Sequence, residues 1–236
     1  MILLSRPANP RPVYLLAGGG ARGRKTPNPL LAAVFKDFGE PAPQIAYIGA
    51  ATEDDSGFLE RMSRFLRESG AGGLHLAPAD DAAEATRVLA GADMVFVSGG
   101  DVELGMRLLG KSGLIPLLHQ HFERGVPFFG LSAGSIMLAR EWVRWRDPHD
   151  DATAETFPCL GLAPVFCDTH GEEQHWEELC ALLQLEEDGA VGYGILTATA
   201  LRVEANGEVQ ALGGPIHRFT RRGGAIEHLP DLLPSG

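Results

Sequence analysis

The stretch Pro127-Phe-Phe-Gly-Leu-Ser-Ala-Gly-Ser-Ile-Met-Leu-Ala139 passes from an apolar run into a helical pattern without a charged residue. Pro127–Leu131 is typical of a strand buried on both faces, and Ser135–Ala139 is typical of a buried helix. Ser132 lies at the turn between them, inside Gly130-Leu-Ser-Ala-Gly134. A buried strand that leads directly into a helix is the repeating unit of parallel sheets in α/β proteins. We therefore expect an α/β fold built around this unit.

The same unit recurs toward the N-terminus. Four earlier apolar runs have the character of buried strands: Val13–Ala17, Ile45–Ile48, Leu74–Leu76 and Met94–Val97. Apolar residues at helical spacing separate several of these runs. The alternation predicts a three-layer fold, with a mostly parallel sheet and helices on both faces. Such sheets bind ligands outside the carboxyl ends of their strands.

The pattern changes after Ala139. A polar stretch, Glu141–Thr156, predicts a long loop or a hairpin beside the sheet. Further along, the sequence predicts a strand over Leu162–Cys167 and a helix over Glu172–Leu183. A C-terminal β-hairpin is predicted over Ala200–Leu212. The hairpin is expected to turn at Asn206-Gly207. No repeat or linker divides the chain, so residues 1–236 are expected to form a single domain.

Composition excludes several classes of protein. Of 236 residues, 44% are hydrophobic and 22% are charged, which is typical of a folded soluble chain. The net charge of −11 disfavours a nucleic-acid partner. No apolar stretch reaches the length of a membrane span, and no signal peptide precedes the fold. The three cysteines form no CxxC pair and are expected to be buried thiols in a reducing compartment, so we predict a cytoplasmic protein. Its oligomeric state stays open, a homodimer included.

Ser132 is the strongest candidate for a catalytic residue. A serine at a strand-to-helix turn between Gly130 and Gly134 has the pattern of a nucleophile elbow. The glycines permit a strained backbone, the hydroxyl projects toward ligand, and the N–H of Ala133 faces a developing oxyanion. A helix N-cap serine beside packing glycines would have the same local sequence. The strand before it and the helix after it favour the catalytic interpretation.

A serine nucleophile needs a base, and His170 is the candidate. It ends the apparent strand Val165–His170, which would place it on the same rim of the sheet as Ser132.

A second strand-to-helix turn, Val97-Ser-Gly-Gly-Asp101, follows the fourth strand. Gly99 and Gly100 would let backbone N–H groups approach a substrate oxygen and complete an oxyanion hole. The alternative is an ordinary turn in which Asp101 caps a helix.

Five segments match one family in order and spacing: Tyr47–Ala51, Val97–Asp101, Gly130–Ser135, Asp168–His170 and Ala211–Gly214. In these segments the chain resembles the peptidase E and cyanophycinase group of serine peptidases, family S51. The resemblance implies a class I glutamine-amidotransferase-like fold and hydrolysis of short peptides through an acyl-enzyme, without metal or another cofactor. It makes Ser132 the nucleophile and His170 the general base, with the N–H groups of Gly100 and Ala133 as the oxyanion hole.

The resemblance also bears on the acidic residue that would orient His170 and on the substrate that the protein would prefer. Asp147 stands where aspartyl-dipeptidase relatives carry an acid, and Glu141 is the other candidate; Asp168 is close to His170 in the chain and is not the first choice. Relatives that prefer aspartate carry an arginine after the histidine, and the run Gly171–Trp176 has none. The acidic pair Glu172 and Glu173 would repel an acidic side chain, so a basic or neutral substrate is expected.

Other interpretations stay open. An α/β-hydrolase esterase would use Leu16–Gly20 as its oxyanion loop and Ser132, Asp168 and His217 as its triad. A nucleotide-binding module is suggested by Gly18-Gly-Gly-Ala-Arg-Gly23, although prolines delay the helix that should follow. The spacing of Cys167, His170 and His175 has no matching second pair, so a metal site is not expected there. A catalytically silent relative of the same fold is a further alternative.

Overall fold

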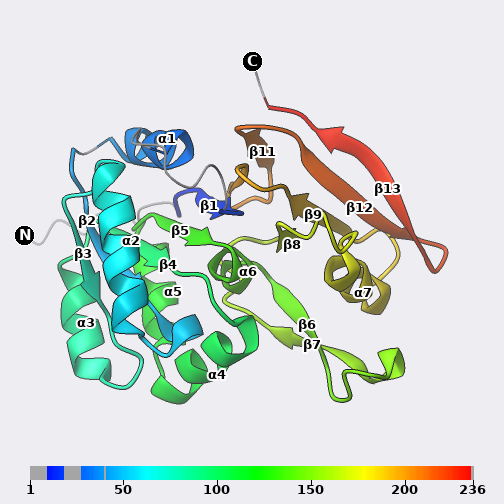
Figure 1. Cartoon of the computed structure of the whole chain (residues 1–236), viewed down its shortest axis with the longest axis horizontal. Coiled ribbons are helices and arrows are strands. Elements are labelled where there is room, and N and C mark those ends of the chain that lie inside the picture. Colours follow the sequence, from blue (N-terminus) through cyan, green and yellow to red (C-terminus); the bar gives the residue numbers. More distant parts are fainter. Residues whose placement is uncertain (1–9, 19–27, 40, 235–236) are drawn as a thin grey trace, which may run out of the picture.

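A computed structural model describes residues 10–18, 28–39 and 41–234 (Figure 1). Seven strands form the main sheet in the order β11-β10-β1-β5-β4-β2-β3. Five of them are parallel: β1 (Val13–Leu16), β2 (Gln44–Ile48), β3 (Gly73–Leu76), β4 (Met94–Val97) and β5 (Phe128–Leu131). The other two, β10 (Ala200–Val203) and β11 (Val209–Leu212), extend the sheet antiparallel beyond β1.

Helices cover both faces of this sheet. Helices α1 (Pro29–Phe38) and α2 (Ser56–Glu68) pack on one face. The other face is covered by α3 (Ala82–Ala90), α4 (Val102–Ser112), α5 (Ile115–Glu123) and α6 (Ala133–Leu138). The side chains of β1 alternate between the two layers, because successive residues of a strand point to opposite faces: Tyr14 joins the first core and Leu15 the second. The predicted three-layer α/β fold is confirmed.

Both predicted hairpins are present. The polar stretch after α6 forms β6 (Glu141–Trp145) and β7 (Ala154–Pro158), joined through the short 3-10 turn Asp151–Thr153. The chain between β10 and β11 turns at Asn206-Gly207, where the N–H of Glu204 donates to the carbonyl of Glu208. A second short 3-10 turn, Ala50–Thr52, follows β2.

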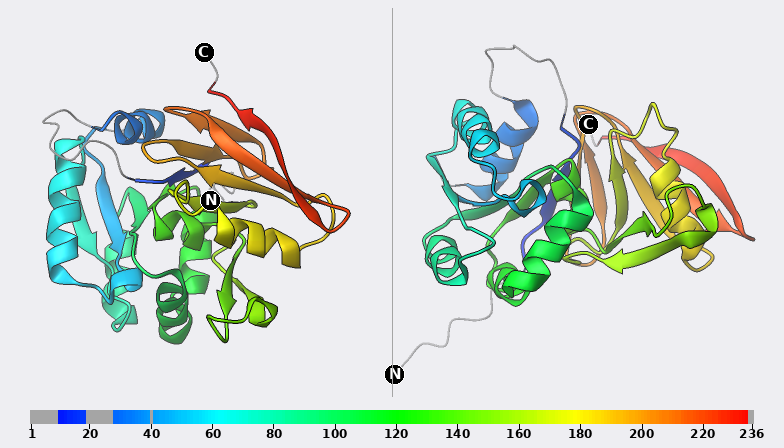
Figure 2. Two further views of the ribbon diagram at one scale, coloured as in Figure 1. Left: turned by 45° about the vertical axis from the view of Figure 1, so that its right-hand side comes forward. Right: turned by 60° about the horizontal axis from the view of Figure 1, so that its bottom comes forward.

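A second sheet of four strands, β13-β12-β9-β8, lies beside the main one (Figure 2). It contains β8 (Phe166–Thr169), β9 (Val191–Ile195), β12 (Ile216–Arg222) and β13 (Ala225–Leu232), with α7 (Glu177–Leu185) packed against it. Strands β12 and β13 form a further, terminal hairpin.

The expectation that the strand before His170 shares a rim with Ser132 in one sheet is therefore wrong. Strand β8 pairs with β9 in the second sheet and does not join the main sheet. The strand also starts later than predicted, at Phe166, and α7 starts at Glu177.

The three cysteines are free thiols, but only Cys167 is fully buried, whereas Cys159 and Cys180 are half-buried. Within the described residues, no helix has both the length and the apolar character needed to cross a membrane. Apart from Gly18, the glycine-rich segment 18–23 lies outside the described residues, as do residues 1–9. The expectations attached to them are not addressed by the structure.

Candidate active site

Ser132 occupies a strained turn between β5 and α6. Its backbone has φ 54° and ψ −127°, a region that non-glycine residues rarely adopt. The turn is held because the Ser132 N–H donates to the carbonyl of Leu16 at 2.8 Å, and the Ser132 carbonyl accepts from the N–H of Ser135 at 2.7 Å. A strained serine between a strand and a helix has the geometry of a nucleophile elbow.

Two glycines allow the surrounding backbone segments to come together. A Cβ at Gly134 would lie 2.0 Å from the carbonyl oxygen of Val97, so the first turn of α6 touches the end of β4. At Gly100, where φ is +145°, a Cβ would lie 2.1 Å from the carbonyl oxygen of Ala51. Any side chain at either position would separate these segments. The close approach places the turn after β4 beside Ser132.

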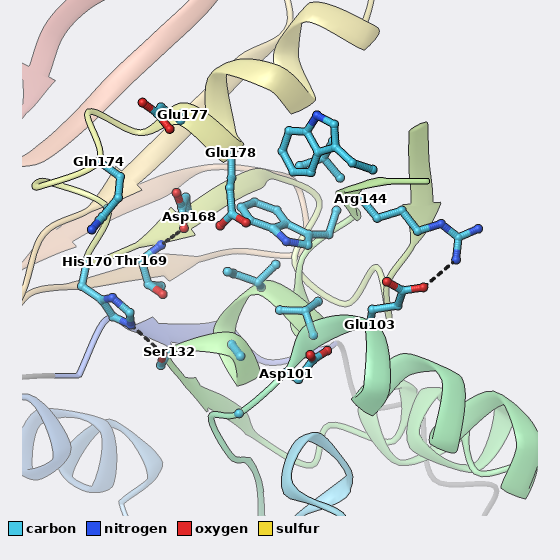
Figure 3. A pocket seen from close by; sticks show the side chains of 18 of the residues that line it. Asp101, Glu103, Ser132, Arg144, Asp168, Thr169, His170, Gln174, Glu177 and Glu178 are labelled. Atoms are coloured by element: carbon cyan, nitrogen blue, oxygen red, sulfur yellow. Dashed lines mark hydrogen bonds and ion pairs between the residues drawn. The ribbon is translucent and has the colours of Figure 1, made fainter. Parts of the chain in front are cut away.

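His170 follows β8 and contacts Ser132 across the junction of the two sheets. Its Nε2 lies 2.6 Å from Ser132 Oγ (Figure 3). The His170 N–H donates to the carbonyl of Ile195 at 2.9 Å, which ties its backbone to β9. When the imidazole carries its proton on Nδ1, Nε2 accepts from the serine hydroxyl, the arrangement that general-base activation requires. The structure thus brings the predicted serine and histidine into direct contact.

The backbone around Ser132 also offers N–H donors. Ala133 is the first residue of α6, so its N–H has no acceptor within that helix. Ala133, Gly100 and Ser132 line the same cavity. Gly99 lies against the Ser132 side chain, because a Cβ built on it would be 3.2 Å from Ser132 Cβ. The Asp101 carboxylate accepts from the N–H of Leu104 at 2.8 Å, so it caps α4 while lining the cavity.

The structure does not bring Asp147 to this pair. Asp147 is exposed in the β6–β7 connection, and its carboxylate accepts from the N–H of His149 at 3.0 Å within the same turn. Neither Asp147 nor Glu141 lines the cavity that contains Ser132 and His170. Glu141 lies near Cys159, where it adds to the effect of burial in raising the pKa of that thiol. Within residues 10–18, 28–39 and 41–234, no carboxylate forms a hydrogen bond or ion pair with His170.

The alternative triad of Ser132, Asp168 and His217 is not assembled. His217 lies on β12, where its Nδ1 is 2.9 Å from Asp231 Oδ1. The serine hydroxyl contacts His170 instead. Cys167 Sγ is buried and lies 3.9 Å from the carbonyl oxygen of Ser135.

Ser132 and His170 open onto a cavity of about 690 Å³. Its lining is rich in carboxylates, drawn from α4, β8 and α7: Asp101, Glu103, Asp168, Glu177 and Glu178 (Figure 3). Arg144 also lines the cavity, but its guanidinium is held by Glu103 at 2.9 Å and Glu155 at 2.8 Å. Nothing in the sequence distinguishes Glu103, Glu177 or Glu178, because acids in the first turn of a helix are ordinary on a solvated surface.

Asp168 is buried, whereas the other four acids are exposed. Its side chain is 6% exposed, and this burial raises the pKa of its carboxyl to about 7. The charges of Glu178 and Glu172 raise the pKa further, whereas the N–H of Thr169, at 2.6 Å, opposes the shift. A cation bound in the cavity would favour the ionised form of Asp168.

With this geometry established, comparison with known proteins gives the family. The model of peptidase family S51 matches residues 14–211, most of the chain. The chain belongs to peptidase family S51. Its membership places it among the serine-type peptidases.

Several relatives resemble this S51 chain in sequence. Peptidase E of Streptomyces coelicolor is 29% identical over 197 residues, which cover 79% of this chain and 78% of that protein. The pyridoxal 5'-phosphate synthase subunit PdxT of Geobacillus thermodenitrificans is 29% identical over 54% of this chain and 60% of its own length. An uncharacterized peptidase of Pasteurella multocida, PM1590, is 32% identical over 37% of this chain. The last two matches therefore span only 60% and 44% of the relatives themselves.

Solved structures agree with the S51 fold. A peptidase from an acI-B1 Actinobacterium superposes with a TM-score of 0.70 at 20% identity, covering 96% of this chain and 95% of that one. A putative peptidase E of Listeria monocytogenes superposes with a TM-score of 0.62 at 17% identity, covering 86% of this chain and 98% of that one. At these identities the likeness establishes the shared fold.

Proposed function

We propose that this S51 chain hydrolyses short peptides through an acyl-enzyme formed on Ser132. The observation that carries the proposal is the 2.6 Å contact between Ser132 Oγ and His170 Nε2 at the mouth of a cavity. His170 takes the hydroxyl proton as Oγ attacks the scissile carbonyl, and returns it to the leaving amine. In the second half of the reaction, His170 takes a proton from a water molecule as that water attacks the acyl-enzyme ester. It then returns the proton to Ser132 Oγ as the carboxylic acid product is released. The N–H groups of Gly100 and Ala133 are the proposed donors to the oxyanion.

The substrate we propose carries a positive charge on a lysine or arginine side chain. The cavity is lined by five carboxylates, and the guanidinium of Arg144 is already paired with two of the chain's glutamates. An acidic side chain entering this cavity would meet like charges, and among the described residues that line it no arginine is free to bind such a side chain. A cavity of about 690 Å³ is large enough for a short peptide.

Covalent labelling tests the proposed nucleophile. A fluorophosphonate should modify the wild-type chain at Ser132, and Ser132→Ala and His170→Ala should each abolish the labelling, because one removes the nucleophile and the other its base. Mass spectrometry of the labelled peptide identifies the site.

Two further variants are controls for this experiment. Ser135→Ala changes a buried serine of the same motif, whose hydroxyl donates to the Leu16 carbonyl, and should keep its labelling. His217→Ala should also keep it, which separates His170 from the alternative base. Labelling of another residue, or persistent labelling of Ser132→Ala, would contradict the proposal.

A dipeptide panel tests the proposed charge preference. Peptides with an N-terminal lysine or arginine should have a higher kcat/KM than those with leucine or aspartate. Glu178→Gln should lower kcat/KM for the lysine peptides about tenfold and leave the leucine peptides unchanged, because a charge-assisted contact contributes about 1.5 kcal/mol or more. Glu173→Gln, an exposed glutamate outside the cavity, is the matched control. A preference for aspartyl peptides would refute this specificity.

A further inference from the structure

A cluster of two histidines and an aspartate lies outside the candidate active site. Its three residues belong to the terminal hairpin of β12 and β13, which is drawn in Figure 1. His217 Nδ1 is 2.9 Å from Asp231 Oδ1, and His228 Nε2 is 3.4 Å from the same oxygen. One donor atom from each of the three residues lies within 4.8 Å of the others. The proposed peptidase chemistry gives these residues no role.

A register shift in the hairpin creates this cluster. Arg218 pairs with Leu229, but Ile216 pairs with Leu232, so two residues of β13, Pro230 and Asp231, lie opposite the single residue His217. In a regular strand, residues three apart point to opposite faces. The extra residue re-aims Asp231 toward the face of His228, as β-bulges on edge strands do. Proline is tolerated in such a bulge because β13 is the outer strand of its sheet.

The donor set and its spacing suit a transition metal. Imidazole nitrogens and a carboxylate oxygen are the ligands that Zn²⁺ accepts in proteins. Ligand atoms about 2.0–2.1 Å from one tetrahedral zinc ion lie roughly 3.3 Å from each other. Separations of 2.9 and 3.4 Å therefore need only small side-chain movements to close around an ion. We propose that His217, His228 and Asp231 form a binding site for a divalent transition-metal ion, with Zn²⁺ as the best match.

The imidazoles are held in place by aromatic neighbours. The Trp176 ring packs edge-on against His217 at 5.9 Å, and Phe219 packs against His228 at 5.1 Å. Packing of this kind limits the rotamers of a side chain and so helps to hold a ligand in position before an ion binds. His228 is itself exposed, so an ion can reach the cluster from solvent.

A second cavity, of about 300 Å³, provides room for the remaining coordination positions. His217 and His228 line it, together with Glu172 and His175 of the segment that follows His170. The Glu172 carboxylate already accepts from the N–H of Thr197. His175 is exposed at the rim of this cavity, so water or His175 would complete the coordination of the ion.

Metal titration of the full chain tests the site. The protein is first dialysed against a chelator, and Co²⁺ is then added as a spectroscopic probe. We expect a visible ligand-field absorption that saturates at one equivalent and disappears when Zn²⁺ is added. Calorimetric titration with Zn²⁺ should give one site, and the melting temperature should rise with Zn²⁺ because the ion binds the folded chain.

Matched variants assign the ligands. His228→Ala and Asp231→Asn should each weaken Zn²⁺ binding at least tenfold, and Asp231→Asn keeps a hydrogen-bond acceptor at nearly the same size. His149→Ala, which removes an exposed histidine of the β6–β7 connection, should bind like wild type. So should Ser132→Ala, which separates this site from the peptidase proposal. Melting curves without metal check that each variant is folded. Absence of saturable binding in wild type, or unchanged binding in folded His228→Ala and Asp231→Asn, would overturn the proposal.

Discussion

The buried carboxyl of Asp168, which lines the candidate site, makes the stability of the fold depend on pH. Burial raises the pKa of its carboxyl to about 7, whereas a free aspartate has its pKa near 3.8. Between these two values the native chain keeps the proton that the unfolded chain has released. The contribution of Asp168 to stability is therefore lost as the pH rises from about 4 to about 7, since its ionisation is favoured in the unfolded state.

Asp168→Asn should remove this pH dependence. Asparagine has nearly the same size and carries no charge, so we expect the variant to be more stable than wild type at pH 8, by about 4 kcal/mol at most. The difference should vanish near pH 4. Urea unfolding at several pH values measures it, with Glu173→Gln as the control for an exposed carboxylate. A variant that is less stable than wild type at pH 8 would show that ionised Asp168 is well solvated or paired.

At the scale of the element, the first turn of α6 depends on contact between two backbones. A Cβ on Gly134 would lie 2.0 Å from the Val97 carbonyl oxygen, and the fully buried strand β4 cannot retreat without repacking the core. Gly134→Ala should therefore destabilise the chain by about 3 kcal/mol or more and displace Ser132.

Gly110→Ala is the matched control for that variant. Gly110 lies within α4, and a Cβ there would meet nothing within 4 Å. Alanine is a better helix former than glycine, so this variant should gain about 0.5–1 kcal/mol. Thermal unfolding of both variants measures the contrast. Equal effects from the two substitutions would mean that the close approach of α6 to β4 is not required.

The elements differ in how well the sequence predicts them. Strands β1, β2, β4 and β5 are apolar on both faces and are followed by helical patterns, so local sequence was enough to place them in a parallel sheet. Local sequence does not predict the second sheet, because β9 contains Gly192 and Gly194 and β13 is half-polar. Which strand pairs with β8 depends on which edges the rest of the chain has already filled, and local sequence does not encode this.

The candidate site shows the same division. Ser132 lies between two glycines, after an apolar strand and before a helical pattern, so its position at the turn can be predicted from local sequence. Glu177 and Glu178 reach the cavity only because α7 packs against the second sheet, and nothing in their spacing indicates it. Asp147 was proposed from a resemblance in chain position, and in the structure its carboxylate is bonded within its own turn.

At the scale of the whole molecule, the two sheets meet where the candidate catalytic pair is formed. Ser132 directly follows β5 of the main sheet, and His170 directly follows β8 of the second sheet. Backbone hydrogen bonds cross this junction, from the N–H of Arg140 to the carbonyl of Val165 at 3.0 Å and from Ala163 to Leu138 at 2.9 Å. The contact between Ser132 and His170 thus requires both sheets to be docked.

The charge of the whole chain leads to a prediction about salt. The net charge is −11, and five of the chain's carboxylates line the cavity onto which Ser132 opens. A cationic peptide should be attracted over distances that salt screens, since the Debye length falls from about 30 Å at 0.01 M to about 3 Å at 1 M. We expect kcat/KM for a lysyl dipeptide to fall about tenfold between 0.01 and 0.5 M NaCl. A peptide with its amine acetylated and a leucine in place of lysine should change by less than about twofold, because it carries no cation for the field to attract. Steady-state kinetics at constant pH measure both. If both peptides lose activity equally, salt acts on the enzyme itself, and the acidic cavity does not select its substrate by charge.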